Sequence, residues 1–577
     1  MRGAVHYTLR WDDPNQHLYD VSIRFRAPKR ETVLRLPAWR PGRYLIQNYA
    51  ANVRQWSAAD SRRKPLRIEK RDKTTWIVRA SAGERVVVSY RFYAGVLDAG
   101  SSFLDESEAY FNGSNLLMMV EPLRGERTTL AFEHPEEWTV ETQLPRKSDG
   151  LFHARDYDHL IDSPAIASPS LVRHSFRESG TEIILAFQNA EGIDTKRFVK
   201  PVRKIVRAHA RLFGGIPTPR YAFLYHLGSL WHGVEHEDSC SIILRRADLL
   251  GAREGSEGFD HFLGITSHEL FHLWNVKRIV PAAFAPYDYS RETYTRLLWV
   301  MEGVTSYYGG RMILRSGVWS TDRYLEHLAR EITTLETSPG REFLSVAQAS
   351  FDAWLQEPAQ MHDKANAWIS FYNKGEIVGA LLDLAIRRAT RGKKSLDDVM
   401  RLLWERYGKR SKGLEEEAFE RAVERVASVG DFFGRYVSGT EPLPYEELFG
   451  SVGVRFVRKR ASAERISFGW ALKKSEGKLL VETVPAASPA RLGGALPNDE
   501  LIAIGGHRVT SPEEVDRVAA SVAGRDGVPV ILSRAGVVST RMMKPIADAT
   551  ETIVLSLGER RDGTQERLLR GWIGAER

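Results

Sequence analysis

The chain has 577 residues, of which 43% are hydrophobic and 27% are charged. This balance is ordinary for a globular protein and excludes a disordered, collagen-like or disulfide-rich chain. The 82 basic and 74 acidic residues leave a formal net charge of +8, but the basic residues are scattered among the acids. No nucleic-acid-binding signature accompanies them, so we expect no nucleic-acid partner. The single cysteine, Cys240, has no second thiol with which to form a disulfide or a metal site.

Membrane insertion is not expected either. No run approaches the roughly 18 consecutive apolar residues that cross a bilayer. The first residues also lack the apolar core of a signal peptide. The sequence therefore favours a cytoplasmic protein with no membrane span.

The pattern along the chain predicts a multidomain α+β protein. Residues 1–170 carry short runs of β-branched and aromatic residues, such as 18–25 and 85–92, and they predict an antiparallel β domain. Residues 171–455 begin with two short strands, at 221–225 and 241–244, and continue with long helical periodicities. The clearest of these predict helices over 260–276, 291–316, 321–337 and 371–391.

The remainder of the chain is shorter. Residues 456–550 alternate short strands with one or two helices, which indicates a single small module. Residues 551–577 are expected to form a tail or a terminal helix.

The strongest chemical signal is the pattern His268-Glu269-Leu270-Phe271-His272. Two histidines four apart lie on one face of a helix, so both rings can reach one metal ion. Glu269 then lies within reach of a water molecule on that ion. A buried helix with histidines that only form hydrogen bonds is the less favoured interpretation.

A catalytic zinc ion takes three protein ligands and keeps one open position. The best third candidate is Glu302, an acid within the apolar run at 299–304. An unpaired carboxylate would be costly there, and a metal would compensate its charge. Pairing of Glu302 with Arg296 or Arg311 is the alternative. We therefore expect Zn²⁺ bound by His268, His272 and Glu302.

These residues resemble the gluzincin metallopeptidases. The continuation at 272–279 (HLWNVKRI) resembles the M61 family, the glycyl aminopeptidase group. Further matching runs are 350–354 (SFDAW), 371–375 (FYNKG), 382–387 (LDLAIR) and, in the β domain, 36–44 (LPAWRPGRY). The resemblance implies an N-terminal β domain, a thermolysin-like zinc peptidase domain and a C-terminal PDZ domain.

The resemblance also implies two substrate sites. Residues 233–236 (GVEH) stand where the related M1 aminopeptidases carry a Gly-x-Met-Glu-Asn motif. Glu235 would bind the free α-amino group of a peptide, and Gly233 would lie on the substrate-pairing strand. Tyr372 matches a tyrosine that stabilises the oxyanion. Within the β domain, Asn112-Gly113 is expected to bring a residue near this site.

Together these features predict a zinc aminopeptidase. A water activated by the metal, with Glu269 as general base, would cleave the first peptide bond of peptides that have a free N-terminus, and small residues such as Gly or Ala would be favoured. Two alternatives stay open. The same site could serve an endopeptidase with a structural Glu235, or the chain could be a PDZ peptide-binding protein with a vestigial metal site.

The small module at 456–550 resembles a PDZ domain. Residues 467–470 (SFGW) would form its carboxylate-binding loop, and 488–492 (SPARL) and 501–507 (LIAIGGH) match the middle of that fold. The module would bind the C-terminus of a peptide by strand addition, or it would dock on the peptidase domain.

Overall fold

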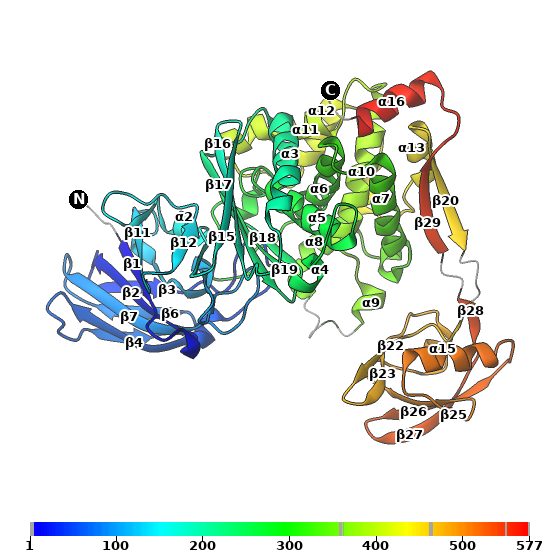
Figure 1. Ribbon diagram of the computed structural model, residues 1–577, viewed down its shortest axis with the longest axis horizontal. Helices are drawn as coiled ribbons and strands as arrows, with labels where there is room; N and C mark the ends of the chain where they lie inside the picture. The colour runs from blue at the N-terminus through cyan, green and yellow to red at the C-terminus, as the bar shows by residue number, and fades with distance from the viewer. Residues whose placement is uncertain (1–4, 357–360, 362, 461–464, 549–550, 575–577) are drawn as a thin grey trace.

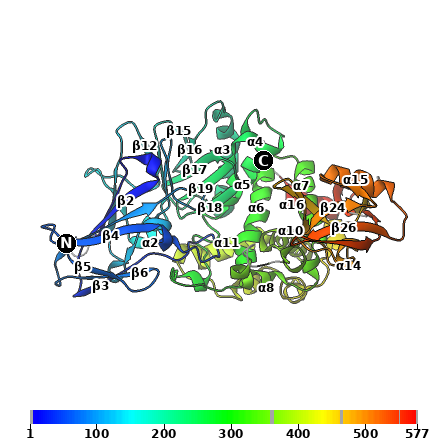
Figure 2. The ribbon, with the colours of Figure 1, turned by 90° about the horizontal axis from the view of Figure 1, so that it is seen from below.

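The computed structural model describes residues 5–356, 361, 363–460, 465–548 and 551–574. Three bodies lie in a row (Figures 1 and 2): an N-terminal β domain, a larger central domain of sheet and helices, and a small β domain at the other end. This is the multidomain α+β architecture that the sequence predicts, with β-sheet first and helices in the middle.

The N-terminal domain consists of three sheets. The strands of its six-stranded sheet are, in spatial order, β13 (Phe152–Ala154), β11 (Thr128–Glu133), β1 (Val5–Arg10), β2 (Leu18–Arg26), β7 (Arg85–Tyr93) and β4 (Val53–Asp60). The two four-stranded sheets are β10 (Met119–Val120), β3 (Glu31–Arg35), β6 (Thr75–Arg79) and β5 (Arg67–Lys70), and β12 (Thr139–Thr142), β14 (Ala165–Ser168), β9 (Ala109–Phe111) and β8 (Phe103–Leu104). The pairing is antiparallel as predicted, except that β1 and β11 are parallel. Alternating buried residues on β2 and β7 supply one face of the core.

The central domain begins with a five-stranded sheet. Its spatial order is β15 (Val172–Glu178), β16 (Thr181–Gln188), β17 (Arg220–Gly228), β19 (Ser239–Arg245) and β18 (His232–Glu235). Helix α3 (Lys196–Phe213) connects the parallel strands β16 and β17. Strand β18 is antiparallel to β19 and forms the edge of the sheet. Its second edge is therefore open to pair with another extended chain.

Helices form the rest of the central domain. The main ones are α5 (Glu257–Phe271), a π-helical turn η5 (Trp299–Val304) that continues into α6 (Thr305–Arg315), α7 (Thr321–Glu336), α10 (Phe371–Ala389), α11 (Leu396–Arg406), α12 (Ala418–Val426) and α13 (Tyr445–Ser451). The predictions over 321–337 and 371–391 agree closely with α7 and α10, whereas the predicted helix over 260–276 corresponds to α5, which ends earlier, at Phe271. The prediction over 291–316 was too long, because the helix begins only at Trp299.

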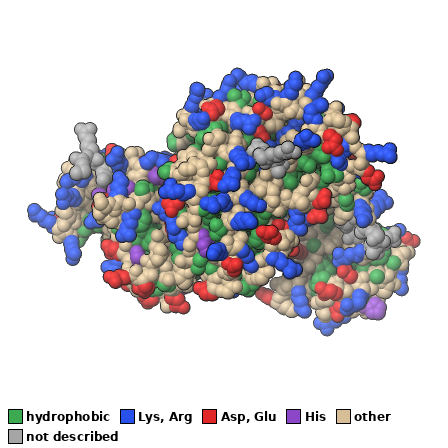
Figure 3. Space-filling model, turned by 45° about the horizontal axis from the view of Figure 1, so that its top comes forward, with side chains coloured by type: hydrophobic (Ala, Val, Ile, Leu, Met, Phe, Trp, Pro, Cys, Tyr) green, Lys and Arg blue, Asp and Glu red, His purple; other side chains and the backbone are tan. Residues whose placement is uncertain are grey.

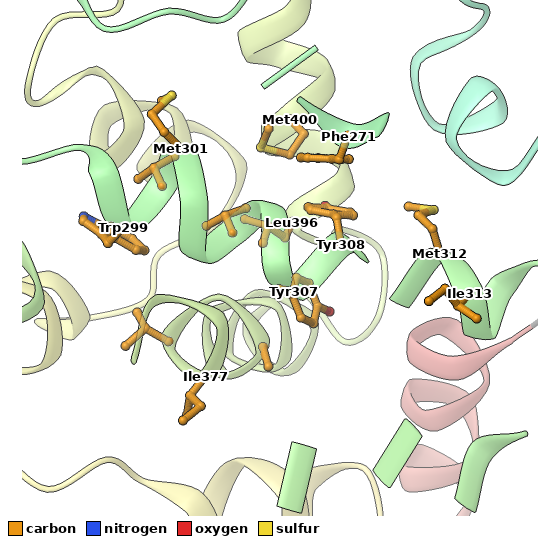
Figure 4. Packing of buried hydrophobic residues seen from close by; sticks show 14 of the residues in the cluster. Phe271, Trp299, Met301, Tyr307, Tyr308, Met312, Ile313, Ile377, Leu396 and Met400 are labelled. Atoms are coloured by element: carbon orange, nitrogen blue, oxygen red, sulfur yellow. The ribbon is translucent and has the colours of Figure 1, made fainter. Parts of the chain in front are cut away.

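Aromatic side chains fill the interior between these helices. In Figure 4, Phe271 of α5 lies flat against Tyr308 of α6, with ring centroids 4.5 Å apart and ring planes 8° apart. Tyr307, on the same helix, donates a hydrogen bond from its hydroxyl to Asp383 Oδ2 on α10 (2.7 Å). This packing fixes α5, α6 and α10 relative to one another.

The small domain is joined to the central domain by a two-stranded ribbon. The chain leaves along β20 (Val454–Arg460) and returns along its antiparallel partner β29 (Glu551–Leu557). Between them lie β21 (Arg465–Ser467), β22 (Ala471–Ser475), β23 (Lys478–Thr483), α14 (Pro489–Leu492), β24 (Glu500–Ile504), β25 (His507–Arg508), α15 (Pro512–Ser521), β26 (Val528–Arg534), β27 (Val537–Met543) and β28 (Ile546–Asp548).

After β29 the chain returns to the central domain. Residues 551–577, expected to be a tail or a terminal helix, contain strand β29 and helix α16 (Gly563–Ile573). Trp572 of α16 is fully buried and donates from its ring nitrogen to the Tyr307 hydroxyl (3.2 Å). Helix α16 is thus part of the packed interior of the central domain.

Three histidines of the central sheet bind carboxylates of the β domain. The Nδ1 atoms of His232 and His236 donate to Asp98 (2.5 Å) and Asp162 (3.0 Å), and His226 Nδ1 donates to Glu108. Cys240, the single cysteine of the sequence, is buried on β19 of the same sheet. These three pairs are polar contacts across the boundary between the two larger domains.

The outer surface is mixed in charge. Basic and acidic side chains are interspersed over the face shown in Figure 3. Among the described helices, none combines the length and the apolar character required to span a bilayer.

Candidate active site

The two histidines of the motif converge at the end of α5. His268 Nε2 and His272 Nε2 lie 3.0 Å apart. Helix α5 ends at Phe271, and His272 Nδ1 donates to the backbone oxygen of Asn275 (2.8 Å). The Asn275 amide in turn donates to the backbone oxygen of Val300 (2.8 Å). With Nδ1 occupied as a donor, Nε2 of His272 has its lone pair free to bind a metal.

Glu302 faces these two rings from the π-helical turn η5. Its Oε2 lies 3.2 Å from His272 Nε2 and 3.7 Å from His268 Nε2. Arg311, an alternative partner suggested by the sequence, instead forms an ion pair with Asp383 (2.9 Å). The ligand atoms of His268, His272 and Glu302 all lie within 4.8 Å of one another, so the chain brings together the three predicted donors.

The acids of the site are buried. Burial alone would raise the pKa of Glu302, but the adjacent His272 and His268 lower it to about 2. Glu269 is 5% exposed, and burial raises its pKa well above the usual range. Its Oε2 is buried and has no hydrogen-bond partner among the described residues. An unsatisfied buried oxygen of this kind indicates that a proton donor belongs beside it.

Strand β18 passes directly over Glu269. A Cβ atom placed on Gly233 would lie 2.1 Å from Glu269 Oε1, so a larger residue at this point of the strand would displace the Glu269 carboxylate. At the end of the strand, the buried Glu235 lies with Glu269 and His272 in a second group of ligand atoms within 4.8 Å of one another. Both predicted substrate residues therefore lie beside the candidate metal ligands.

These residues line one cleft of about 410 Å³. Tyr372, in the first turn of α10, is 37% exposed, and its ring centroid lies 6.1 Å from that of His268. The Ser370 hydroxyl caps this helix by accepting from the backbone N–H groups of Tyr372 and Asn373. The other walls of the cleft come from Trp231, His232, Gly264, Ile265, Ser306, Gly310, Trp319, His327 and Glu376.

Sequence reasoning missed two contributions from the β domain. The Tyr44 hydroxyl donates to Glu302 Oε1 (3.1 Å), and Gly42 lies against the Glu235 carboxylate. Asn112 and Gly113 are not among the residues that line this cleft, and Gly113 packs against Ile161 within its own domain. The sequence feature nearest to Tyr44 and Gly42 is the Pro-Gly turn within the run at 36–44. Nothing in that turn indicates a contact with the metal ligands.

Comparison with protein families agrees with this site. Residues 6–169 match the peptidase M61 N-terminal domain, and residues 261–378 match the M61 glycyl aminopeptidase. The second match spans the two histidines, Glu269, Glu302 and Tyr372. The chain is a metallopeptidase. Within that class, both matched regions are domains of the M61 family, as the resemblance in the sequence predicted.

Solved structures extend the comparison. An aminopeptidase N family protein from Idiomarina loihiensis is 29% identical, with a TM-score of 0.92 over 99% of this chain and 100% of that chain. An M1 zinc metallopeptidase from Deinococcus radiodurans bound to a Tyr-Ser-Ala substrate is 13% identical, with a TM-score of 0.46 over 77% of this chain and 96% of that chain. No curated protein matches the chain.

Proposed function

We propose that this metallopeptidase is a zinc-dependent aminopeptidase that hydrolyses the N-terminal peptide bond of peptides. The observation that carries the proposal is the position of Glu235. This buried carboxylate lies at the end of the edge strand β18, beside Glu269 and the metal ligand candidates. A negative charge so close to the reacting atoms would bind the α-amino group of a substrate whose first peptide bond lies over the metal.

The donor set fits zinc. Two imidazole nitrogens and one carboxylate oxygen are the ligands of many catalytic zinc sites, and His268, His272 and Glu302 would supply them. The orphaned Glu269 Oε2 adjoins this set, where a water molecule would complete its hydrogen bonding. When bound, zinc would supply Lewis acidity, polarising the scissile carbonyl and making the attacking water more acidic.

Glu269 would act as the general base. Its carboxylate would take a proton from the attacking water and pass it to the nitrogen of the leaving amine. The Tyr372 hydroxyl would donate a hydrogen bond to the carbonyl oxygen as negative charge develops on it. Its ring stacks on that of His268 at 28°, which supports a position on the metal side of the cleft.

The substrate backbone would pair with β18. An extended peptide lying antiparallel to this edge strand would place its N-terminus at Glu235 and would continue toward His232 and Trp231. The absence of a side chain at Gly233 keeps the strand close to Glu269 and hence to the scissile bond. We also propose that small first residues such as Gly or Ala are preferred, as the family description suggests.

The test is hydrolysis of Gly-, Ala- and Leu-p-nitroanilides with and without a zinc chelator, beside an N-acetylated control. The proposal expects release only from the free-amine substrates and loss of that release with the chelator. Cleavage of blocked or longer peptides at internal bonds would instead establish the endopeptidase alternative. No cleavage by zinc-loaded protein would favour a peptide-binding protein.

The matched test of the amine anchor is Glu235→Gln against Glu237→Gln. Glu237 lies two residues further on and pairs with Arg155 outside the cleft. Loss of one charge-assisted hydrogen bond should reduce kcat/KM for Ala-p-nitroanilide on the order of 10–100-fold in Glu235→Gln and leave Glu237→Gln near the wild type. Equal kcat/KM values in the two variants would make Glu235 structural.

We further propose that the small domain is a PDZ domain, and that the chain divides at residues 170, 455 and 550. The support is a groove of about 260 Å³ that is lined by β21, the edge strand β22 and helix α15. Phe468, Trp470, Leu472, Val515 and Ala519 line it. The free strand edge beside a helix suits the C-terminus of a peptide added as an extra strand. A docking role is supported by Asn366, whose amide binds Val484 O and Ala486 N of this domain (2.9 Å each).

A further inference from the structure

One segment of the β domain reaches into the metal site. The segment Arg40–Tyr44 links β3 to the rest of its domain, yet Tyr44 is only 6% exposed and lies among residues of the central domain. Its ring packs against Phe284, Trp354 and Phe371, with centroid distances of 6.1, 6.1 and 6.2 Å. Three aromatic contacts leave the ring little rotational freedom, so the position of its hydroxyl is well determined.

The two oxygens of the Glu302 carboxylate have different partners, and the Tyr44 hydroxyl contacts one of them. It donates to Oε1 at 3.1 Å, whereas Oε2 is the oxygen that faces His272 and His268. A carboxylate held by one oxygen presents the other in a fixed direction. Hydrogen bonds of this kind to metal ligands orient the ligand and raise its affinity for the ion.

The same segment touches the candidate amine anchor. Gly42 has a φ of +78°, a left-handed conformation that favours glycine. A Cβ atom at this position would lie 2.6 Å from Glu235 Oε2 and 3.0 Å from Oε1. A side chain on residue 42 would therefore displace the Glu235 carboxylate from the position that it has here. Its backbone closes the cleft at the end where the N-terminus of a substrate would lie.

We propose that Tyr44 and Gly42 are positioning residues, through which the β domain fixes the metal ligand Glu302 and the amine anchor Glu235. The role of Gly42 rests on the proposed aminopeptidase function, whereas that of Tyr44 needs only the metal site. The β domain is on this view a working part of the active site, because it sets both the metal affinity and the end of the substrate channel.

The first experiment compares Tyr44→Phe with Tyr49→Phe in the full chain. Tyr49 is also a buried tyrosine of the β domain, but its hydroxyl donates to Gln47. Zinc affinity is measured by competition with a chromogenic chelator, and thermal unfolding of the metal-free proteins is measured alongside. Tyr44→Phe should bind zinc about 10-fold more weakly at an unchanged unfolding temperature, since second-shell losses typically cost about 10–100-fold. Equal zinc affinities in the two variants would overturn the role of Tyr44.

The second experiment compares Gly42→Ala with Gly83→Ala. Gly83 has a φ of +82° in the same domain but has no atom within 4 Å of an added Cβ, so it controls for backbone strain. Binding of alaninamide to each protein is measured by calorimetry, which requires no turnover. Gly42→Ala should weaken amine binding about 10-fold or more and leave zinc affinity unchanged, and Gly83→Ala should change neither. Equal amine binding in both variants would overturn the role of Gly42.

The zinc-affinity and alaninamide-binding measurements test the roles of Tyr44 and Gly42 separately. If the wild type binds alaninamide no more tightly than Glu235→Gln does, the amine anchor fails and the role of Gly42 fails with it. The zinc measurement on Tyr44→Phe still decides the role of Tyr44 in that case. If Tyr44→Phe binds zinc more weakly while Gly42→Ala binds the amine normally, the role of Tyr44 is supported and the role of Gly42 is overturned.

Discussion

A substitution of Glu269 can separate metal binding from catalysis. Its carboxylate is buried beside the ligand set but is not one of the three converging donors His268, His272 and Glu302. In Glu269→Gln, zinc should stay bound, while kcat should fall by about 10²–10⁴-fold because the general base is lost. Measured zinc content and turnover of Ala-p-nitroanilide test this together.

The control for this change is Glu326→Gln, an exposed acid on α7. It should keep both zinc and turnover. Substantial activity in Glu269→Gln would remove Glu269 from the role of base, and loss of zinc would show that the carboxylate helps to hold the ion.

Single residues also show what the sequence can predict about this site. The spacing of His268 and His272 follows from helix geometry, and Glu302 stands out as an acid in an apolar run, so local patterns sufficed for the ligand candidates. Tyr44 and Gly42 lie in another domain and reach the site only through tertiary packing. No local pattern encodes such a contact, which explains why they were missed.

At the scale of elements, helix α3 carries a buried histidine that should make stability depend on pH. His209 is fully buried, its ring stacks on that of Trp274 at 12°, and burial lowers its pKa to about 4. The unfolded chain binds this proton below about pH 6.5, whereas the folded chain binds it only below about pH 4. Unfolding in this window takes up a proton, so the free energy of unfolding falls by about 3 kcal/mol as the pH drops from 6.5 to 4.

The variant His209→Phe keeps the stacked ring and removes the titrating group. Its free energy of unfolding should therefore fall less than that of the wild type between pH 7 and pH 4.5. Urea denaturation at the two pH values measures the difference. Parallel losses in the two proteins would contradict the prediction.

A close crossing of η5 and α10 gives a second prediction at this scale. A Cβ atom on Gly303, which follows Glu302, would lie 2.4 Å from Gly375 Cα. Gly303→Ala should force the two elements apart and lower the free energy of unfolding by about 1–3 kcal/mol. It should also weaken zinc binding, because Glu302 moves with the turn.

The control is Gly450→Ala in α13, where an added Cβ meets nothing within 4 Å. That change should be neutral or stabilise the fold by up to about 1 kcal/mol. Denaturant unfolding and chelator competition on both variants test the pair. If Gly303→Ala has the stability and zinc affinity of the wild type, the backbones of η5 and α10 can move apart without a measurable cost.

Helix boundaries show where prediction at this scale stops. The expected helix over 291–316 begins only at Trp299, because the Thr295 hydroxyl (2.6 Å) and the Arg296 backbone N–H (2.9 Å) donate to Glu416 instead. Glu416 lies more than a hundred residues further along the chain. Periodicity could therefore indicate the helix but not its start, since a distant partner decides the first turn.

At the scale of the whole molecule, the small domain is inserted between two paired strands. Arg460 and Glu551 are opposite each other in the ribbon of β20 and β29. Replacing residues 461–550 with an Asn-Gly turn should therefore join the strands as a hairpin. We expect this protein to keep its fold and its zinc affinity, as judged by thermal unfolding and chelator competition.

Truncation after Arg460 makes the contrasting variant. It removes the small domain together with β29 and α16, including the buried Trp572. Loss of a fully buried tryptophan and its neighbours should destabilise the central domain by more than about 3 kcal/mol. If the truncated protein is as stable as the hairpin variant, α16 does not support the central domain as we describe.

The position of α16 also affects how the protein is made. During synthesis the chain emerges from its N-terminus, so the β domain and the metal ligands are available long before Trp572. The central domain cannot close its interior until the inserted small domain and β29 have been produced. A nascent chain therefore carries its whole candidate metal site while part of its interior is still open. Packing of α16 against the central domain is therefore a late step that follows production of the inserted small domain.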